Sequence, residues 1–258
     1  MKIAVCVKLV PSTTARIQPG ADGKALDLAG VEMVLSPYDG YALEEALKAR
    51  EKLAGSTILA VSAGPAAASA ALTQAYEVGA DEALHVKAEG LDAAAAARCA
   101  AAVLKAEKPG LVFCGRQAID DDQWLFPALL GELLDLPHVT AVSGFELAAD
   151  GSSATCRRRV EGGEEVLAVK LPAVISCDKG LNEPRVPTLK GRLNAKKKQV
   201  ASKTPAELGL SGADLMPALE IVSYAPPPEK SPGRIVEAPA AEAAAELAKW
   251  MRDEAKVI

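Results

Sequence analysis

Aromatic residues are scarce in this chain: they make up 3% of its 258 residues, although 50% of the residues are hydrophobic. The core must therefore be built from Ala, Val, Leu and Ile, which suits helices packed on a parallel sheet whose strands are buried on both faces. No stretch reaches the roughly 18 apolar residues that a membrane helix requires. Residues 1–8 are typical of a first strand rather than a signal peptide. We therefore expect a soluble, cytoplasmic protein.

Histidines and paired cysteines, the usual materials of catalytic and metal sites, are also scarce. The two histidines, His85 and His138, have no second ligand type near them in sequence, so neither a metal site nor a Ser-His-Asp or Cys-His arrangement is predicted. The five cysteines are odd in number and form no CxxC pair, which favours buried free thiols over disulfides. The net charge of -5 gives no general attraction to nucleic acid. We expect a protein without catalytic residues of its own, and therefore not an enzyme.

The first half of the chain alternates aliphatic runs with helical patterns. Strands are predicted over 3–10, 58–64, 83–86 and 111–115, with a loop or small hairpin over 11–35. Helices are predicted from residues 36–39 to Gly55, over 66–78, over 91–107 and from residues 120–122 to about 136. This alternation is typical of right-handed crossovers, so the fold class is α/β with a doubly wound, mostly parallel, Rossmann-like sheet that can bind adenine nucleotides.

The second half follows other patterns. Residues 139–147, 154–160 and 166–176 are extended candidates separated by turn signals, which indicates an antiparallel addition to the sheet. Residues 179–198 show little periodicity. Six of the 17 prolines lie in 201–238, which indicates an extended arm, and an amphipathic helix follows over about 240–254. We divide the chain into an α/β domain, 1–200, and an arm with a terminal helix, 201–258, that packs on a partner subunit.

Three segments follow predicted strands and are candidates for a ligand site. In an open parallel sheet, ligands bind beyond the carboxyl ends of the strands. The segments are 7–8, 62–65 and 114–120, and no Walker motif or GxGxxG accompanies them. Nucleotide binding and plain turns both explain their glycines. The triplet Asp120, Asp121 and Asp122 suggests helix capping more than a metal or acid–base site.

Several collinear motifs resemble one known family. They are the run over 158–176, the segments 181–185 and 195–198, and, upstream, 115–122 and 36–39. Together they resemble electron transfer flavoprotein beta subunits along nearly the whole chain. Cys156 departs from the family pattern, since a small aliphatic residue or glycine is usual there.

The resemblance implies a heterodimer with an alpha subunit that holds most of a redox FAD, while the beta subunit binds a structural AMP. Tyr38 resembles an aromatic residue that leans on the flavin, and Thr13 takes the place of a second flavin-side residue. The cofactor-binding residues that it implies are Cys6, Ser36, Pro37, Tyr38, Asp39, Ala63, Gly115, Arg116, Gln117, Ala118, Ile119, Asp120, Asp121, Asp122, Gln123, Trp124, Leu125 and Phe126.

Residues 179–198 resemble the family's recognition loop, which docks on partner dehydrogenases. Leu189 matches the leucine that anchors there; the alternative is that it packs on its own subunit. Lys196, Lys197 and Lys198 add positive charge for acidic partners. The implied function is to carry electrons from flavin dehydrogenases, such as acyl-CoA dehydrogenases, to a quinone-linked or other oxidoreductase, without membrane insertion.

Residues 123–127 depart from the family, which has small and polar residues there. Gln123 is followed by two aromatics, a leucine and Pro127, so the site binds AMP through backbone N–H groups, binds it differently, or does not bind it. Some relatives carry a second FAD instead of AMP, usually with glycine in place of Asp121, so this aspartate favours AMP. The rival from another class is a stand-alone adenine-nucleotide enzyme or ATP-binding module.

Overall fold

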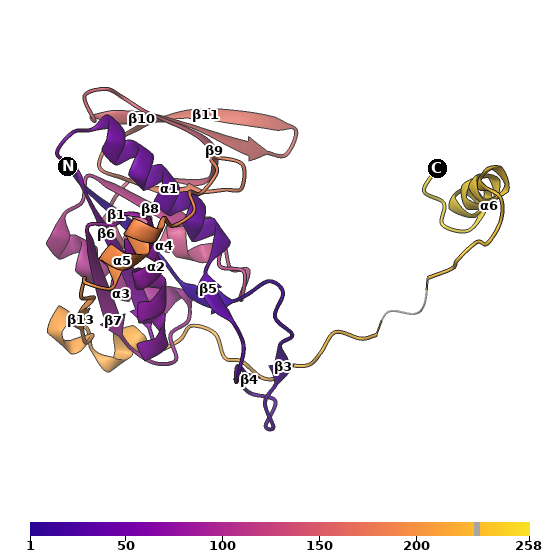
Figure 1. Ribbon diagram of the computed structural model, residues 1–258, viewed down its shortest axis with the longest axis horizontal. Coiled ribbons are helices and arrows are strands. Elements are labelled where there is room, and N and C mark those ends of the chain that lie inside the picture. The colour runs from indigo at the N-terminus through magenta and orange to yellow at the C-terminus, as the bar shows by residue number, and fades with distance from the viewer. Residues whose placement is uncertain (230–232) are drawn as a thin grey trace.

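The computed structural model describes residues 1–229 and 233–258. Its centre is a nine-stranded sheet in the order β11-β10-β9-β12-β8-β1-β6-β7-β13, in which the neighbours from β9 to β13 are parallel and β10 and β11 are antiparallel additions (Figure 1). The strands of this sheet are β1 (Lys2–Cys6), β6 (Thr57–Gly64), β7 (Glu82–Lys87), β8 (Leu111–Gly115), β9 (His138–Leu147), β10 (Ser153–Val160), β11 (Gly163–Lys170), β12 (Ala173–Cys177) and β13 (Ala201–Lys203).

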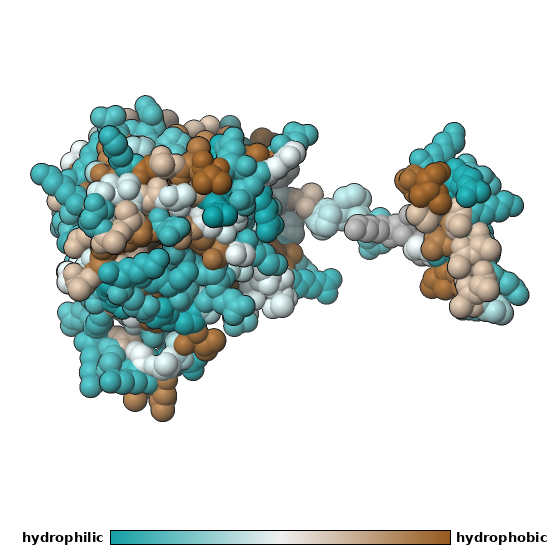
Figure 2. Space-filling view, turned by 90° about the horizontal axis from the view of Figure 1, so that it is seen from above, coloured by the Kyte–Doolittle hydropathy of each residue, from teal (hydrophilic) through white to brown (hydrophobic). Residues whose placement is uncertain are grey.

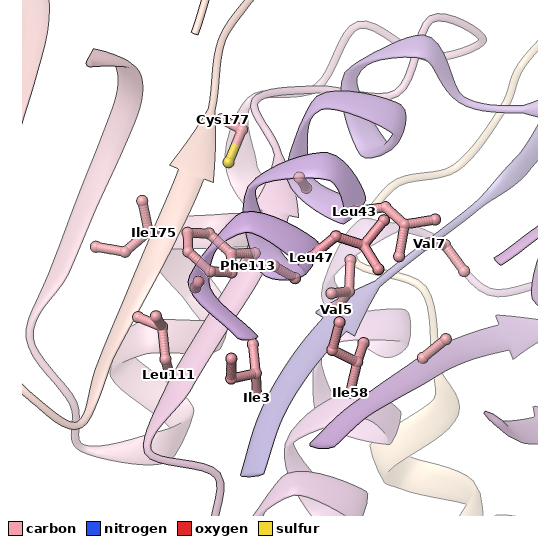
Figure 3. Packing of buried hydrophobic residues seen from close by; sticks show 14 of the residues in the cluster. Ile3, Val5, Val7, Leu43, Leu47, Ile58, Leu111, Phe113, Ile175 and Cys177 are labelled. Carbon is pink, nitrogen blue, oxygen red and sulfur yellow. The ribbon is translucent and has the colours of Figure 1, made fainter. Parts of the chain in front are cut away.

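Helices cover both faces of the sheet, because the side chains of each strand alternate between two apolar layers. Ile3 and Val5 of β1 pack in one layer with the helices α1 and α2 (Figure 3). Ala4 and Cys6 pack in the other layer with α3 and α4. The predicted doubly wound, mostly parallel α/β fold is confirmed. The helices are α1 (Pro37–Lys52), α2 (Ser69–Val78, preceded by the 3-10 turn η1, Ala66–Ala68), α3 (Ala93–Glu107), α4 (Leu125–Leu134), α5 (Leu189–Ala195) and α6 (Ala240–Asp253).

The first predicted strand, 3–10, is wrong in one respect: it is two strands. β1 ends at Cys6, and β2 (Leu9–Pro11) pairs with β5 (Met33–Leu35) in a separate small sheet. The backbone leaves the main sheet at Lys8, whose N–H donates to the carboxylate of Asp39 (2.8 Å) rather than to a strand. The hairpin expected within 11–35 is present as β3 (Gln18–Pro19) and β4 (Leu26–Asp27).

The third extended candidate, 166–176, is also two strands. β11 is the outer antiparallel strand, and after Leu171 and Pro172 the chain returns as β12, which lies between β9 and β8 and is parallel to both. Burial explains the difference: all five residues of β12 are buried, whereas most of β11 is exposed. The prediction of an antiparallel addition therefore holds for β10 and β11 but is wrong for β12.

The region after residue 178 is more ordered than its sequence predicts. The aperiodic segment 179–198 contains α5, whose Thr188 hydroxyl accepts the N–H of Gly191. Residues 201–203, expected at the start of the arm, form β13 on the edge of the sheet, and Leu208, Leu210 and Leu215 pack on the layer that contains α3. The extended arm therefore begins after the 3-10 turns η2 (Ala206–Leu208) and η3 (Gly212–Leu215).

The C-terminal part of the chain leaves the α/β body as an extended segment and ends in α6 (Figure 1). Residues 230–232, which fall within the predicted arm, lie outside the described residues. None of the 14 residues of α6 is buried, and Leu247 (52%) and Trp250 (39%) are exposed. Figure 2 shows hydrophobic surface on this part of the chain, at the right of the view. In the two described ranges, no helix combines the length and the apolarity needed to cross a membrane. Packing of this arm on a partner subunit stays a prediction.

Candidate functional site

A cavity of about 510 Å³ opens at the carboxyl ends of β1, β6 and β8. β6 and β8 flank β1 on opposite sides, because the chain builds outward from β1 to β7 and then crosses back through α3 to β8. This reversal of strand order is the place where open α/β sheets bind ligands, and cavities of about 300–1,000 Å³ accommodate small molecules. The cavity thus lies where the sequence predicts a ligand site.

The structure brings half of the predicted cofactor residues to this cavity. Those that line it are Cys6, Asp39, Ala63, Gly115, Gln117, Ala118, Asp121, Gln123 and Phe126. Those that do not line it are Ser36, Pro37, Tyr38, Arg116, Ile119, Asp120, Asp122, Trp124 and Leu125. The second group is mixed: Ser36 is fully buried, whereas Trp124 (54%) and Leu125 (46%) are exposed.

Two parts of the wall were missed from the sequence. Residues 89–92, between β7 and α3, line the cavity, as do Leu28, which follows β4, and Met33, the first residue of β5. Residues 89–92 follow a strand of the parallel sheet, as the other predicted wall segments do, and Gly90 adopts a positive φ of 65° there. A glycine just past a predicted strand was therefore a usable signal, whereas nothing local marks Leu28 and Met33.

Asp39 joins the ends of two strands at the floor of the cavity. Its carboxylate accepts the backbone N–H of Lys8 at the end of β1 (2.8 Å) and of Gly115 at the end of β8 (3.0 Å). Burial raises the pKa of this carboxyl to about 7, although the two N–H donors act in the opposite direction. Asp39 is therefore a structural link whose charge depends on pH near neutrality.

Replacing Asp39 by asparagine is expected to remove a pH-dependent component of stability. The unfolded carboxyl titrates near 3.8 and the folded one near 7, so between these values the folded chain binds more protons than the unfolded chain. The wild type's free energy of unfolding relative to Asp39→Asn should therefore fall as pH rises from about 4 to about 7, by a few kcal/mol at about 1.4 kcal/mol per pH unit. Urea titrations of both proteins at a series of pH values measure this difference.

Asp150→Asn is the control, because its stability difference from the wild type should change with pH in the opposite direction. The Asp150 carboxylate accepts the N–H and the hydroxyl of Ser152, which lower its pKa, so the wild-type advantage over this variant should be lost as pH falls below about 4. A wild-type advantage over Asp39→Asn that grows between pH 4 and pH 7 would contradict the role given to Asp39.

The predicted capping role of the aspartate triplet is wrong. Helix α4 begins at Leu125 and has no side-chain cap. Asp120 and Asp121 instead pair with the ammonium of Lys8 (2.8 and 2.9 Å), and Asp122 accepts from Gln117. Burial lowers the pKa of Lys8, but the two carboxylates outweigh it, and the net shift is upward. The triplet therefore fastens the segment after β8 to the end of β1.

The electrostatics of the cavity favour a ligand that is bound through backbone groups rather than through cations. Among the described lining residues, Lys8 is the one cation, and it is already paired, whereas Glu89, Asp92 and Asp121 are acidic. The first turn of α4 reaches the wall at Phe126, and the first N–H groups of a helix have no partner within it. Pro127, also on the wall, contributes none.

Residues 179–198, which we predict to be a recognition loop, are fastened to α1. Arg185 forms two hydrogen bonds from its guanidinium to Glu44 (both 2.8 Å) and one to Glu51 (2.9 Å), while Asn182 donates to the carbonyl of Tyr41 (3.0 Å). Leu189, at the first turn of α5, is 76% exposed, and Val186 and Leu193 are exposed near it. The alternative that Leu189 packs on its own subunit is therefore wrong for this structure.

All five cysteines are buried free thiols, as expected, and burial raises the pKa of Cys6 and Cys114 on the cavity wall. These thiols are consequently poor nucleophiles. Throughout the described ranges, no group of three or more His, Cys, Asp or Glu side chains is placed to hold a metal ion.

Comparison with known proteins agrees with this arrangement. The model of the electron transfer flavoprotein domain matches residues 25–208. Electron transfer flavoprotein subunit beta of Syntrophomonas wolfei is 36% identical over 258 residues, covering 100% of this chain and 98% of that protein, and the corresponding protein of Bradyrhizobium diazoefficiens is 36% identical over 100% of both. The human protein of the same name is 35% identical over 92% of this chain and 93% of its own length. The chain belongs to the family of electron transfer flavoprotein beta subunits.

Proposed function

We propose that this chain binds AMP in the cavity and, with an alpha subunit, encloses an FAD that carries electrons from flavin dehydrogenases, such as acyl-CoA dehydrogenases, to a quinone-linked or other oxidoreductase. The observation that carries the proposal is the cavity at the carboxyl ends of β1, β6 and β8, in a chain of the electron transfer flavoprotein family. The FAD supplies the electron-transfer chemistry. The chain itself holds the nucleotide, forms part of the flavin's surroundings and presents the recognition loop.

The residues at the cavity fit an adenosine group together with a phosphate held by the backbone. Ala63, Leu91, Ala96 and Ala100 give one side an apolar surface for a flat ring, and Gly64 leaves the end of β6 without a side chain. A phosphate finds N–H groups at the start of α4. Asp121 is fixed by Lys8 and occupies part of the wall, which supports AMP over a larger second FAD.

Tyr38 and Thr13 are the residues proposed to approach the FAD. Tyr38 is half-buried at the first turn of α1, next to Asp39, and Thr13 is exposed in the connection that follows β2. The two lie outside the AMP cavity, as a separate flavin site requires. The arm and α6 are proposed to pack on the alpha subunit, which would cover Ile235 (84% exposed) and Leu247 (52% exposed). The cytoplasmic location stays a prediction.

Co-expression with the alpha subunit tests the proposal. We expect a yellow heterodimer that yields, after acid extraction and mass analysis, about one FAD and one AMP per heterodimer. Two FAD molecules and no AMP per heterodimer would show that a second FAD, and not AMP, occupies the cavity. A stable colourless monomer that hydrolyses ATP would contradict the carrier function and favour the stand-alone nucleotide enzyme.

A further inference from the structure

Arg116 lies between the cavity loop, residues 115–126, and the start of the recognition loop. Its backbone N–H donates to the carbonyl of Cys177 at the end of β12 (3.0 Å), so this position joins the ends of β8 and β12. Its side chain is only 19% exposed. Its guanidinium carbon lies 4.0 Å from the centroid of the Trp124 ring and 4.8 Å from the centroid of the Tyr38 ring. These contacts hold the guanidinium in one place, which suits a positioning role more than a mobile surface charge.

The guanidinium divides its donors among three partners. Nε donates to Oε1 of Gln117 (2.9 Å), Nη1 to Oδ2 of Asp178 (2.8 Å) and Nη2 to the hydroxyl of Tyr38 (2.9 Å). A planar group with five fixed donors can hold three partners in one geometry, which a point charge cannot do. Arg116 therefore fixes three segments relative to one another: the cavity loop, the first turn of α1 and the segment after β12.

One of these partners lines the cavity. Gln117 borders the cavity, and its amide is shared between Arg116, from which it accepts, and Asp122, to which it donates. A nucleotide that hydrogen-bonds to Gln117 or packs against it fixes the orientation of this amide. The acceptor position that Arg116 uses is thereby fixed as well.

Another partner begins the recognition loop. The Asp178 carboxylate is 15% exposed, and its second oxygen accepts the N–H of Lys179 (2.6 Å), while its backbone carbonyl accepts the N–H of Leu181 (3.3 Å). Loss of the Arg116 contact would leave this carboxylate half-paired and free to turn toward solvent. The first residues of the recognition loop, 179–182, would then lose their fixed starting point.

We propose that Arg116 is a positioning residue that couples nucleotide occupancy of the cavity to the order of the recognition loop. The connection runs through Gln117, Arg116 and Asp178 to Lys179, and each link is a hydrogen bond of this structure. The proposal rests on AMP binding as proposed above and extends it: AMP contributes to partner docking although it lies outside the docking surface.

Hydrogen exchange of the heterodimer, stripped of nucleotide and then saturated with AMP, tests the coupling. In the wild type, AMP is expected to slow the exchange of the backbone amides of residues 179–182 about tenfold, a coupling within the usual range for linked sites. In Arg116→Met, which keeps an apolar stem but no donor, AMP should bind and leave this exchange rate unchanged within about twofold. Asp178→Asn should behave in the same way, and it serves if Arg116→Met does not fold.

Two control variants distinguish the proposed connection from a general loss of order. Arg50→Met removes a comparable arginine, which bonds Asp81 and the carbonyl of Gly79 away from the cavity, and it should keep the full AMP response. Leu189→Ala should also keep it, since it alters the docking surface and not the connection.

The remaining outcomes distinguish a failure of the proposed coupling from a failure of the proposed function. An equal AMP response in Arg116→Met and the wild type overturns the role of Arg116. AMP that binds the wild type without slowing exchange overturns the coupling and leaves the proposed function standing. Failure of AMP to bind the wild type removes both the nucleotide part of the proposed function and the coupling.

Discussion

Replacing Gly115 by alanine is expected to lower the free energy of unfolding by about 3 kcal/mol, at the upper end of the cost of overpacking a well-packed site. A Cβ at this position would lie 2.5 Å from Oδ1 of Asp39 and 2.8 Å from the backbone carbon of Tyr38. Neither can move freely, because Asp39 is tied to the ends of β1 and β8 and Tyr38 belongs to the first turn of α1. The methyl group would therefore push α1 from the sheet or break the N–H···O bond from Gly115 to Asp39.

Equilibrium urea unfolding of the purified chain, followed by circular dichroism, measures this cost. Gly163→Ala is the matched control, because Gly163 also lies in the main sheet, needs no positive φ and has no atom within 4 Å of the position that an alanine Cβ would take. We expect that control to change stability by less than about 0.5 kcal/mol. Equal stability of the two variants would show that α1 approaches the end of β8 less closely than described.

The same mutation is also expected to impair nucleotide binding, since Gly115 and Asp39 both line the cavity. AMP content of the co-purified heterodimer should fall in Gly115→Ala and stay at the wild-type level in Gly163→Ala. A close approach of backbone to side chain, rather than a flexible turn, is thus the reason for a glycine at the end of β8.

The sequence predicts the layout of the fold well because local signals and tertiary structure agree there. Aliphatic runs that end at Gly64 and Gly115 became strands β6 and β8, and the ligand cavity lies beyond their carboxyl ends. Such runs are buried on both faces, so their composition alone marks them as central strands. The position of the cavity then follows from topology, without any family-specific motif.

Long-range contacts explain what the sequence does not predict. The aspartate triplet resembles a helix cap, but Lys8, more than a hundred residues earlier, takes two of its carboxylates. The insertion of β12 between β9 and β8 depends on burial from both sides, which a run of apolar residues continuing from β11 cannot reveal. Likewise, the pairing of β13 with β7 is decided by an open sheet edge, not by residues 201–203 themselves.

The placement of Leu189 depends on two features that flank it. On one side, Arg185 anchors the chain to Glu44 and Glu51 of α1. On the other, the backbone of Gly191 lies so close to the carbonyl of Glu77 at the end of α2 that a side chain cannot be placed between them. A side chain held on both sides of its position in the chain is presented in a defined orientation, which would lower the entropy cost of the proposed docking.

One of the three lysines that follow Leu189, at 196–198, binds to the chain's own body. Lys198 donates to the carbonyls of Ala80 and Asp81 (2.7 and 3.1 Å) and lies 4.7 Å from the ring of Tyr76, so it fastens the end of the recognition loop to the body. Lys196 and Lys197 are exposed and can attract an acidic partner. We therefore expect the apolar contact to determine affinity and these two lysines to affect mainly the rate of association.

Leu189→Ala is accordingly expected to raise the KM for the reducing dehydrogenase about ten- to a hundredfold, with little change in kcat. Burying a leucine side chain contributes about 1.5–3 kcal/mol, and about 1.4 kcal/mol corresponds to a factor of ten. Steady-state reduction of the heterodimer by a flavin dehydrogenase measures KM, and its flavin absorbance should match that of the wild type. Val166→Ala, which truncates another exposed apolar residue, on β11 (60% exposed, against 76% for Leu189), should leave KM unchanged. An unchanged KM in Leu189→Ala would remove this residue from docking, whereas a lowered flavin content would show that α5 contacts the alpha subunit instead.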